Sequence, residues 1–301
     1  MRKKSLHGLW FVLPFFITLA VFQAYPIVDT VATSFTDDNL NQIDHDPAWV
    51  GLQNYATELK SELFSKALVN TLVISGFSML LQIGLALLLT ALLTSHELKL
   101  KGRGAWQVIF FAPSQISVSI LAVYAFVLFG WNGVVNHLLH QNDQTAYTNF
   151  FGTPAAVWSL LVAGTVFLSF GITAYLLINS VQAIPKPVFE AAMIDGASGR
   201  QVFFRVILPQ LRPMLLFIVV LSLIIDVSMF DLPWGLFGVD RGRGEGGLTL
   251  GTYAYQRAFV WDFDLGSASA VITVVFALIA ALSALYFRIM RRTQEELSLW
   301  T

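Results

Sequence analysis

The sequence predicts an all-α membrane protein with six transmembrane helices, and three observations support this fold class. The chain of 301 residues is 56% hydrophobic and only 12% charged, whereas about 25% of the residues in an ordinary soluble domain are charged. Six apolar stretches are long enough to cross a bilayer. The basic residues gather in the segments that would lie on one side of that bilayer.

Each predicted span is an apolar stretch that fits the bilayer core, which is about 30 Å thick and needs roughly 20 helical residues. We expect one transmembrane domain covering residues 1–301, with a fifth span that is the shortest and extends toward Trp234. The spans lie near residues 9–28, 67–94, 105–130, 155–182, 214–230 and 266–287.

The first stretch has the basic start of a signal peptide, because Arg2, Lys3 and Lys4 precede it. It is longer, however, than the roughly 7–15 apolar residues of a signal peptide, and no clear small-x-small cleavage site follows. We therefore expect a retained span.

The positions of lysine and arginine predict the orientation, because translocation of basic residues is disfavoured. With both termini in the cytoplasm, residues 183–213 are cytoplasmic and the loops 131–154 and 231–265 are external, and the external loop after the first span is acidic. The cytoplasmic segments then hold most of the basic residues: Arg2, Lys3, Lys4, Lys99, Lys101, Arg103, Lys186, Arg200, Arg205, Arg212, Arg288, Arg291 and Arg292.

The overall charge and the cysteine content bound the function only loosely. The 18 basic and 19 acidic residues nearly cancel, so the balance gives no sign of a nucleic-acid partner. The chain has no cysteine, which excludes disulfides, iron–sulfur clusters and thiol chemistry.

The loop between the fourth and fifth spans is predicted to begin with a short helix. Pro185 and Pro187 suit a first helical turn, so the helix is expected to start near Pro187. Glu190 would lie close to its N-terminus, where a carboxylate interacts favourably with the helix dipole. Ala191 and Ala192 keep one side of the helix thin.

A hinge and a second helix are predicted to follow. Gly196 is a natural helix stop, and Ser198 and Gln201 have the spacing of a capping box. Pro209 and Pro213 are expected to break the chain before the fifth span. The loop is then either a rigid docking element or an ordinary loop punctuated by proline and glycine.

The residue order of this loop resembles the EAA motif of permease subunits of binding-protein-dependent ABC importers. In that motif Glu-Ala-Ala is followed by Gly and then by Ile-x-Leu-Pro. The matching residues here are Glu190, Ala191, Ala192, Gly196, Ile207, Leu208 and Pro209. The stretches "NTLVIS" at 70–75, "LKGRGAWQVIFFAPSQIS" at 100–117, "MFDLPWGLF" at 229–237 and "AFVWDFDLGSASA" at 258–270 are similar to the carbohydrate branch of the family, the maltose and glycerol-phosphate permeases.

This resemblance implies a type I ABC importer permease fold with a cytoplasmic coupling helix in a bacterial or archaeal cytoplasmic membrane. It implies three kinds of protein partner besides lipid and a carbohydrate substrate: a second homologous permease, two ATP-binding cassette ATPase subunits and an extracellular solute-binding protein. No Walker A sequence occurs in the chain, so it is not expected to be an enzyme. ATP and Mg are expected on the ATPase subunits, with no cofactor in this chain.

The resemblance also implies roles for the loop residues. Glu190 would pair with a basic group of the ATPase, and Ala191 and Ala192 would permit its close approach. Gly196 would allow the bend between the helices. Asp195 is either a contact residue or simply a polar residue near the helix end.

Asp226 lies deep in the fifth span, where an ionised carboxylate costs roughly 2.5–3.5 kcal/mol on insertion scales. It should therefore face a wet cavity or form a structural hydrogen bond to another helix. By resemblance to the maltose permease, Ser169, Ser222 and Asp226 would line a sugar site. Tyr124 and Phe230 would either stack on the sugar or simply pack.

Other patterns are weak as functional signals. The glycines at 242, 244, 246 and 247 lack the context of a nucleotide-binding loop. His137 and His140 have helical spacing but no third metal ligand, and Asp262 and Asp264 lack a second acidic cluster. After Asp231 the sequence departs from the family pattern, so residues 231–265 are either a binding-protein surface or a flexible loop.

Two further classes of function stay open beside the importer subunit. A self-sufficient secondary transporter or channel would need inverted repeats or discontinuous spans with paired charges, and a membrane enzyme would need a convergent acidic or metal-binding cluster. The substrate is either a neutral sugar or a sugar or glycerol phosphate. The absence of lysine and arginine well inside the spans favours the neutral sugar.

Overall fold

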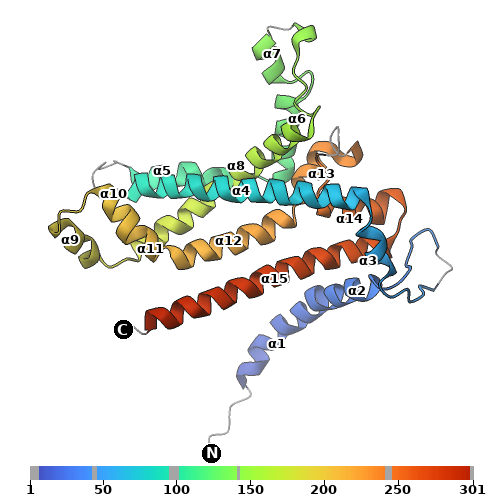
Figure 1. Ribbon diagram of the computed structural model, residues 1–301, viewed down its shortest axis with the longest axis horizontal. Coiled ribbons are helices and arrows are strands. Elements are labelled where there is room, and N and C mark those ends of the chain that lie inside the picture. The colour runs from blue at the N-terminus through green and yellow to red at the C-terminus, as the bar shows by residue number, and fades with distance from the viewer. Residues whose placement is uncertain (1–6, 43–45, 95–101, 141–142, 241–245, 299–301) are drawn as a thin grey trace, which may run out of the picture. The chain divides into compact units, whose positions relative to one another are not determined.

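The computed structural model describes residues 7–42, 46–94, 102–140, 143–240 and 246–298 (Figure 1). The described residues form helices, turns and two isolated β-bridges, without a strand. They belong to two compact units. The first unit comprises Met1–Ser65 and Tyr253–Ala277, and the second comprises Lys66–Thr252 and Leu278–Thr301.

In the first unit, the N-terminal helix continues past Pro26 instead of ending there. A π-helical turn immediately precedes α2, whose first turn contains Pro26, and such a turn accommodates the missing N–H of proline. The helix therefore continues to Thr33, beyond the predicted limit at residue 28. The elements are α1 (His7–Leu19), the π-helix Ala20–Ala24, α2 (Tyr25–Thr33), α3 (Gln53–Glu58), the π-helix Arg257–Trp261 and the start of α15 (Leu265–Ser298).

The second unit holds most of the remaining helices, and α4, α14 and α15 have residues in both units. Its elements are α4 (Glu62–Thr94), α5 (Arg103–Phe111), the 3-10 helix Ala112–Gln115, α6 (Val118–Phe129), α7 (Val134–His140), the 3-10 helix Gln144–Ala146, α8 (Pro154–Gln182), α9 (Lys186–Ile194), α10 (Gly199–Val202), the π-helix Phe203–Ile207, α11 (Leu208–Gln210), α12 (Arg212–Val227), α13 (Asp231–Phe237), the 3-10 helix Gly238–Asp240 and α14 (Leu250–Gln256).

Six helical segments of the described chain are long and apolar enough to cross a membrane, which confirms the predicted number of spans. The second, fourth and sixth agree closely with the prediction. The third and fifth differ. The six segments are Trp10–Thr33, Glu62–Thr94, Val118–His140, Pro154–Gln182, Arg212–Phe237 and Leu265–Ile289.

The third predicted span, 105–130, was wrong as one continuous helix. Pro113 lies in a 3-10 turn that ends α5, and Ile116 and Ser117 have extended backbones before α6 starts at Val118. Proline has no N–H for the helix ladder, so the chain can change direction here. Figure 1 shows α6 running steeply across the direction of α5.

The fifth span is also interrupted. The helix α12 ends at Val227, and α13 begins at Asp231. The helix α13 packs against α6, with Leu232 and Leu236 buried in the same apolar cluster as Ala122. The breaks in the third and fifth spans therefore lead into two half-helices that pack on each other.

Candidate functional site

The EAA stretch forms the capped helix pair that the sequence predicted. The helix α9 ends in a Schellman motif, because Gly196 N–H bonds the Met193 carbonyl and Ala197 N–H bonds the Ala192 carbonyl. Gly196 has a φ of +75°, which glycine adopts without a side-chain clash. A capping box of Ser198 and Gln201 then starts α10.

Two details of this predicted pair were wrong. The helix α9 starts at Lys186, so Glu190 lies in its second turn, and no acidic residue occupies the first turn. Pro209 lies within α11 and does not itself end the helix, because the π-helix Phe203–Ile207 before it accommodates the proline ring. The predicted break before the fifth span comes two residues later, at Leu211 between α11 and α12.

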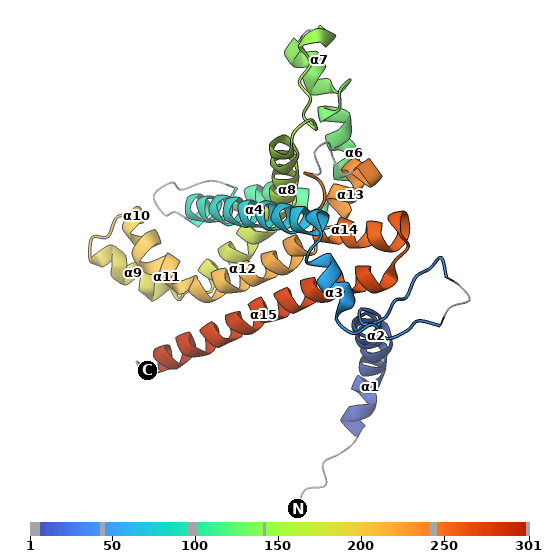
Figure 2. The same cartoon turned by 45° about the vertical axis from the view of Figure 1, so that its right-hand side comes forward.

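The helix α9 has one anchored face and one exposed face. Val188, Phe189 and Ala192 pack against an apolar cluster of α4, α8 and α12 residues. Glu190 and Asp195 are exposed, and the side chain of Ile194 is 86% exposed. Figures 1 and 2 show α9 at the end of the second unit, beyond the ends of α8 and α12. The exposed face of α9 therefore carries both charged and apolar side chains.

A cavity of about 220 Å³ lies where α12 breaks. Three of the predicted pathway residues line it: Ser169 from α8, Asp226 from the end of α12 and Phe230 from the break. The helix break matters because it lets side chains and backbone of residues 228–230 face the cavity. The full lining is Val118, Thr165, Leu168, Ser169, Ile225, Asp226, Ser228, Met229, Phe230, Asp231 and Leu232.

The cavity has a mostly apolar lining that carries several polar groups and no positive charge. Asp226 is only 2% exposed, and its Oδ2 atom is buried without a hydrogen-bond partner among the residues that the structure describes. Thr165, Ser169 and Ser228 add hydroxyl groups, and the lining includes no lysine or arginine. Phe230 stacks on Trp234 with the ring centroids 5.7 Å apart. The arrangement can accept hydrogen bonds from a hydroxylated solute and offer it an aromatic wall.

Two other predicted pathway residues lie outside this cavity. Ser222 is buried one turn before Asp226 and accepts a hydrogen bond from Gln82 Nε2 over 2.6 Å. Tyr124 lies on α6 beyond the residue Val118 that reaches the cavity, and its side chain is 61% exposed.

Some polar residues of this region were not predicted from the sequence. Thr165 lines the cavity one turn before Ser169. On α4, Ser75, Ser78 and Gln82 are buried and follow one face of the helix. Their signal was visible as a polar stripe with helical spacing in an apolar span, which marks a face turned toward the protein interior.

Residues near the predicted external loops pair with one another. Asn136 is fully buried and accepts the Thr148 N–H at 2.9 Å, which organises the loop after α6. Tyr147 Oη lies 2.7 Å from His137 Nδ1. No group of three or more histidine or acidic residues within the described part of the chain could hold a metal ion.

The two discounted aspartates belong to an ion-pair network in the first unit. Arg257 pairs with Asp262, and its guanidinium lies 3.6 Å from Asp264 and 2.7 Å from the buried Glu58. Tyr253 donates a hydrogen bond of 2.5 Å to Glu58. Burial and this bond raise the pKa of Tyr253 to about 12. Burial alone would lower the pKa of Arg257, but Glu58 and Tyr253 raise it.

Several predicted features lie outside the described residues. They are the termini with Arg2, Lys3 and Lys4, the basic residues Lys99 and Lys101, the glycines at 242 and 244, and Arg241 and Arg243 of the loop after Asp231. The side chains of Arg291 and Arg292 also lie outside them.

Comparison with known proteins gives one family over most of the chain. The family described as "Binding-protein-dependent transport system inner membrane component" matches residues 73–295. The chain is 30% identical over 288 residues to the probable ABC transporter permease protein YurN of Bacillus subtilis (strain 168), covering 95% of this chain and 96% of that protein. It is 28% identical over 290 residues to the trehalose/maltose transport system permease protein MalF of Thermococcus litoralis, covering 96% and 95%.

A solved structure has the same fold. A chain of a bacterial alginate ABC transporter, in complex with a periplasmic protein that holds an alginate pentasaccharide, aligns with a TM-score of 0.78 at 22% identity, covering 97% of this chain and 96% of that chain. The predicted type I importer permease fold is thereby confirmed. The chain therefore belongs to the family of binding-protein-dependent transport system inner membrane components, as its EAA motif predicted.

Proposed function

We propose that this chain is the membrane-spanning permease subunit of an ATP-driven carbohydrate importer. Family membership supports a transport subunit, and the relatives named for trehalose and maltose and for alginate support a carbohydrate substrate. The observation that carries the proposal is the helix α9, which is capped at its C-terminus, anchored on one face and exposed on the other at the end of the second unit.

The helix α9 acts as the coupling helix that docks on an ATPase subunit. ATP binding can shift the transporter between conformations only through contacts that differ between them. The apolar anchor of α9 on α4, α8 and α12 supports this role, because a movement of α9 would be transmitted to α8 and α12, which border the cavity. Ile194 supplies an apolar contact, and Glu190 supplies a charge for a basic partner.

The cavity at the α12 break forms part of the sugar pathway. Asp226 accepts hydrogen bonds from sugar hydroxyls, since its carboxyl group brings acceptor oxygens into the cavity lining. The orphaned Oδ2 of Asp226 supports a polar ligand, and the absence of lysine and arginine from the lining favours a neutral sugar over a sugar or glycerol phosphate.

The rest of the importer follows from these assignments. Both termini and α9 lie in the cytoplasm, ATP and Mg bind to two separate ATPase subunits, and a second permease completes the pathway. An extracellular binding protein delivers the sugar. The basic residues Lys186, Arg200, Arg205 and Arg212 near α9 support this orientation.

One observation favours the alternative function of a secondary transporter: the third and fifth spans are discontinuous. Such transporters place paired charges at their broken helices. Here Asp226 is the buried carboxylate of the cavity, and none of the cavity residues is basic. The importer subunit is therefore the better supported function.

Affinity purification of the tagged full chain from its native host tests the proposal. Wild-type chain should retain an ATPase and a second permease, identified by mass spectrometry, and cells should take up radiolabelled oligosaccharide. Glu190→Lys and Gly196→Val should each reduce ATPase retention and uptake. Asp143→Asn removes an exposed carboxylate far along the chain from α9 and should preserve both. Sugar uptake by the purified chain alone in liposomes would overturn the proposal.

A further inference from the structure

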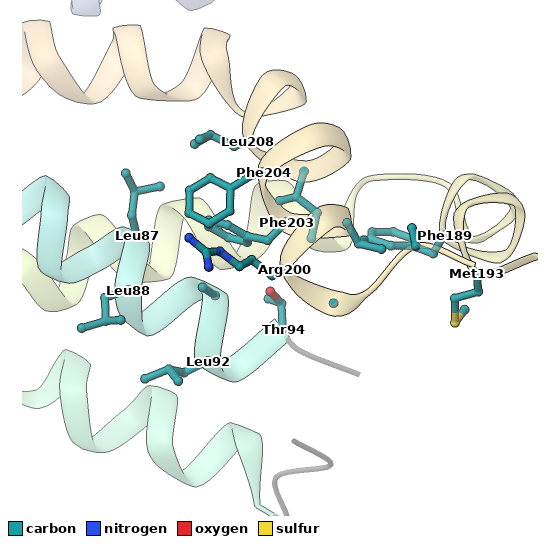
Figure 3. A pocket seen from close by; sticks show the side chains of 15 residues that line it. Leu87, Leu88, Leu92, Thr94, Phe189, Met193, Arg200, Phe203, Phe204 and Leu208 are labelled. Atoms are coloured by element: carbon teal, nitrogen blue, oxygen red, sulfur yellow. The ribbon is translucent and has the colours of Figure 1, made fainter. Parts of the chain in front are cut away.

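A large groove lies between the end of α4 and the segment from α9 to α11, all within the second unit (Figure 3). Its volume of about 710 Å³ falls among the roughly 300–1,000 Å³ of pockets that hold organic ligands. One wall is the leucine-rich end of α4, and the other consists of aromatic and aliphatic residues of the segment from α9 to α11. The lining comprises Leu87, Leu88, Ala91, Leu92, Thr94, Phe189, Met193, Ala197, Gly199, Arg200, Val202, Phe203, Phe204, Ile207 and Leu208.

The groove continues into a surface that suits lipid. Along α4, Leu81, Leu85, Leu88 and Leu92 are 49%, 44%, 57% and 43% exposed and follow one face of the helix at helical spacing. Because α4 is a membrane-spanning helix, this face meets hydrocarbon. Leu88 and Leu92 belong both to this face and to the groove. An acyl chain can therefore enter the groove from the bilayer without crossing a polar surface.

The polar end of the groove is cationic. Arg200 alone carries a charge among the described lining residues. Its guanidinium lies 5.9 Å from the ring centroid of Phe204, and Figure 3 shows the side chain extending from α10 toward α4. The carboxylates of α9, Glu190 and Asp195, do not line the groove. Thr94, the last described residue of the α4 span, lines the same groove as Arg200, and the planar guanidinium of arginine matches the geometry of a phosphate group.

We propose that this groove binds an anionic phospholipid, with one acyl chain between α4 and the α10–α11 segment and the phosphate at Arg200. A pocket that combines an apolar channel open to hydrocarbon with a basic residue at the membrane surface fits such a lipid. Since Phe189 and Met193 of α9 form the opposite wall, a bound lipid would connect the span α4 to α9 and stiffen that connection.

Photolabelling of the full chain in lipid nanodiscs tests this inference. The probes are phosphatidylglycerol and phosphatidylcholine that carry the same diazirine in one acyl chain. Phosphatidylglycerol should label peptides containing residues 87–92 and 202–208, and Arg200→Gln should reduce that labelling about fivefold, the effect expected for one basic group at an anionic surface. The matched control Arg205→Gln removes a nearby exposed arginine that does not line the groove and should leave labelling unchanged.

Filling the groove provides an independent variant. Ala91→Trp should block labelling of residues 202–208 by either lipid while the chain keeps its elution volume in detergent. Equal labelling by the two lipids, or an Arg200→Gln variant that labels like the wild type, would overturn the proposal. Loss of labelling once the chain is in the assembled transporter would also overturn it, because a polypeptide would then cover the groove.

Discussion

Gln82 Nε2 donates a hydrogen bond to Ser222 Oγ over 2.6 Å and so joins α4 to α12 inside the second unit. Both residues are buried, at 1% and 7% exposure. Asp226 follows Ser222 by one turn of the same helix and lines the cavity. The bond therefore fixes the rotation of α12 that turns Asp226 toward the cavity.

Breaking this bond should destabilise the chain modestly. In Gln82→Leu, Ser222 loses its donor, and hydrogen bonds between membrane helices contribute about 0.6 kcal/mol on average and at most about 1.7 kcal/mol. A double-mutant cycle with Ser222→Ala, measured by thermal unfolding in detergent, should give a coupling energy in that range. Gln182→Leu, at the exposed end of α8, is the control and should leave stability nearly unchanged. Purely additive effects would contradict a direct bond.

Asp226 should control substrate affinity through its acceptor oxygens. Asp226→Asn keeps the size of the side chain but replaces one acceptor oxygen with an NH2 donor, and leaving a buried hydrogen-bonding group without its partner costs about 1–3 kcal/mol. We expect the KM of sugar uptake to rise roughly tenfold or more, with normal amounts of chain in the membrane. Asp143→Asn, which removes an exposed carboxylate that does not line the cavity, is the control. A variant with normal KM but reduced chain in the membrane would assign Asp226 a structural role.

Tyr253 should ionise only in strong alkali. Burial and the hydrogen bond to Glu58 raise its pKa to about 12, whereas an unfolded tyrosine has a pKa of about 10. The folded chain thus holds this proton more tightly, so the stability it contributes is complete below about pH 10 and is lost as the pH rises toward 12.

An ultraviolet titration of the phenolate tests whether the pKa of Tyr253 is raised in the folded chain. The wild-type curve minus the Tyr253→Phe curve should give one step centred near pH 12. Glu58→Gln removes the negative acceptor and should move that step to lower pH. A step at the ordinary value of about 10 would show that Tyr253 is hydrated in solution.

Hydrophobic and capping patterns predicted much of the fold because they act over short stretches of chain. A span needs only its own apolar residues, and the α9–α10 pair needs only Gly196 and the capping box of Ser198 and Gln201. The third-span break had a local marker in Pro113, but uniform apolar composition on both sides concealed it.

The fifth-span break and several of the buried polar contacts depend on distant residues. No proline lies between Val227 and Phe230, and α13 is held by packing of Leu232 and Leu236 in the cluster of α6. The sequence marked Asp226 because a carboxylate is unusual in a span. Its neighbour Thr165 has no such local signal, and neither does the pairing of Glu58 with Arg257, which lies 199 residues further along the chain.

Gly171 should be required for the close packing of α5 on α8. An added Cβ at this buried position would overlap the carbonyl oxygen of Phe110, so α5 and the turn that follows it would have to move away from α8. Gly171→Ala should therefore destabilise the chain by about 1–3 kcal/mol, the usual cost of overpacking. Gly84→Ala is the matched control, because a Cβ there meets no atom within 4 Å, and helical Ala is favoured over Gly by roughly 0.5–1 kcal/mol. In thermal unfolding in detergent, the melting temperature should fall for Gly171→Ala and rise for Gly84→Ala. Equal shifts in the melting temperature would show that α5 and α8 do not approach closely at Gly171.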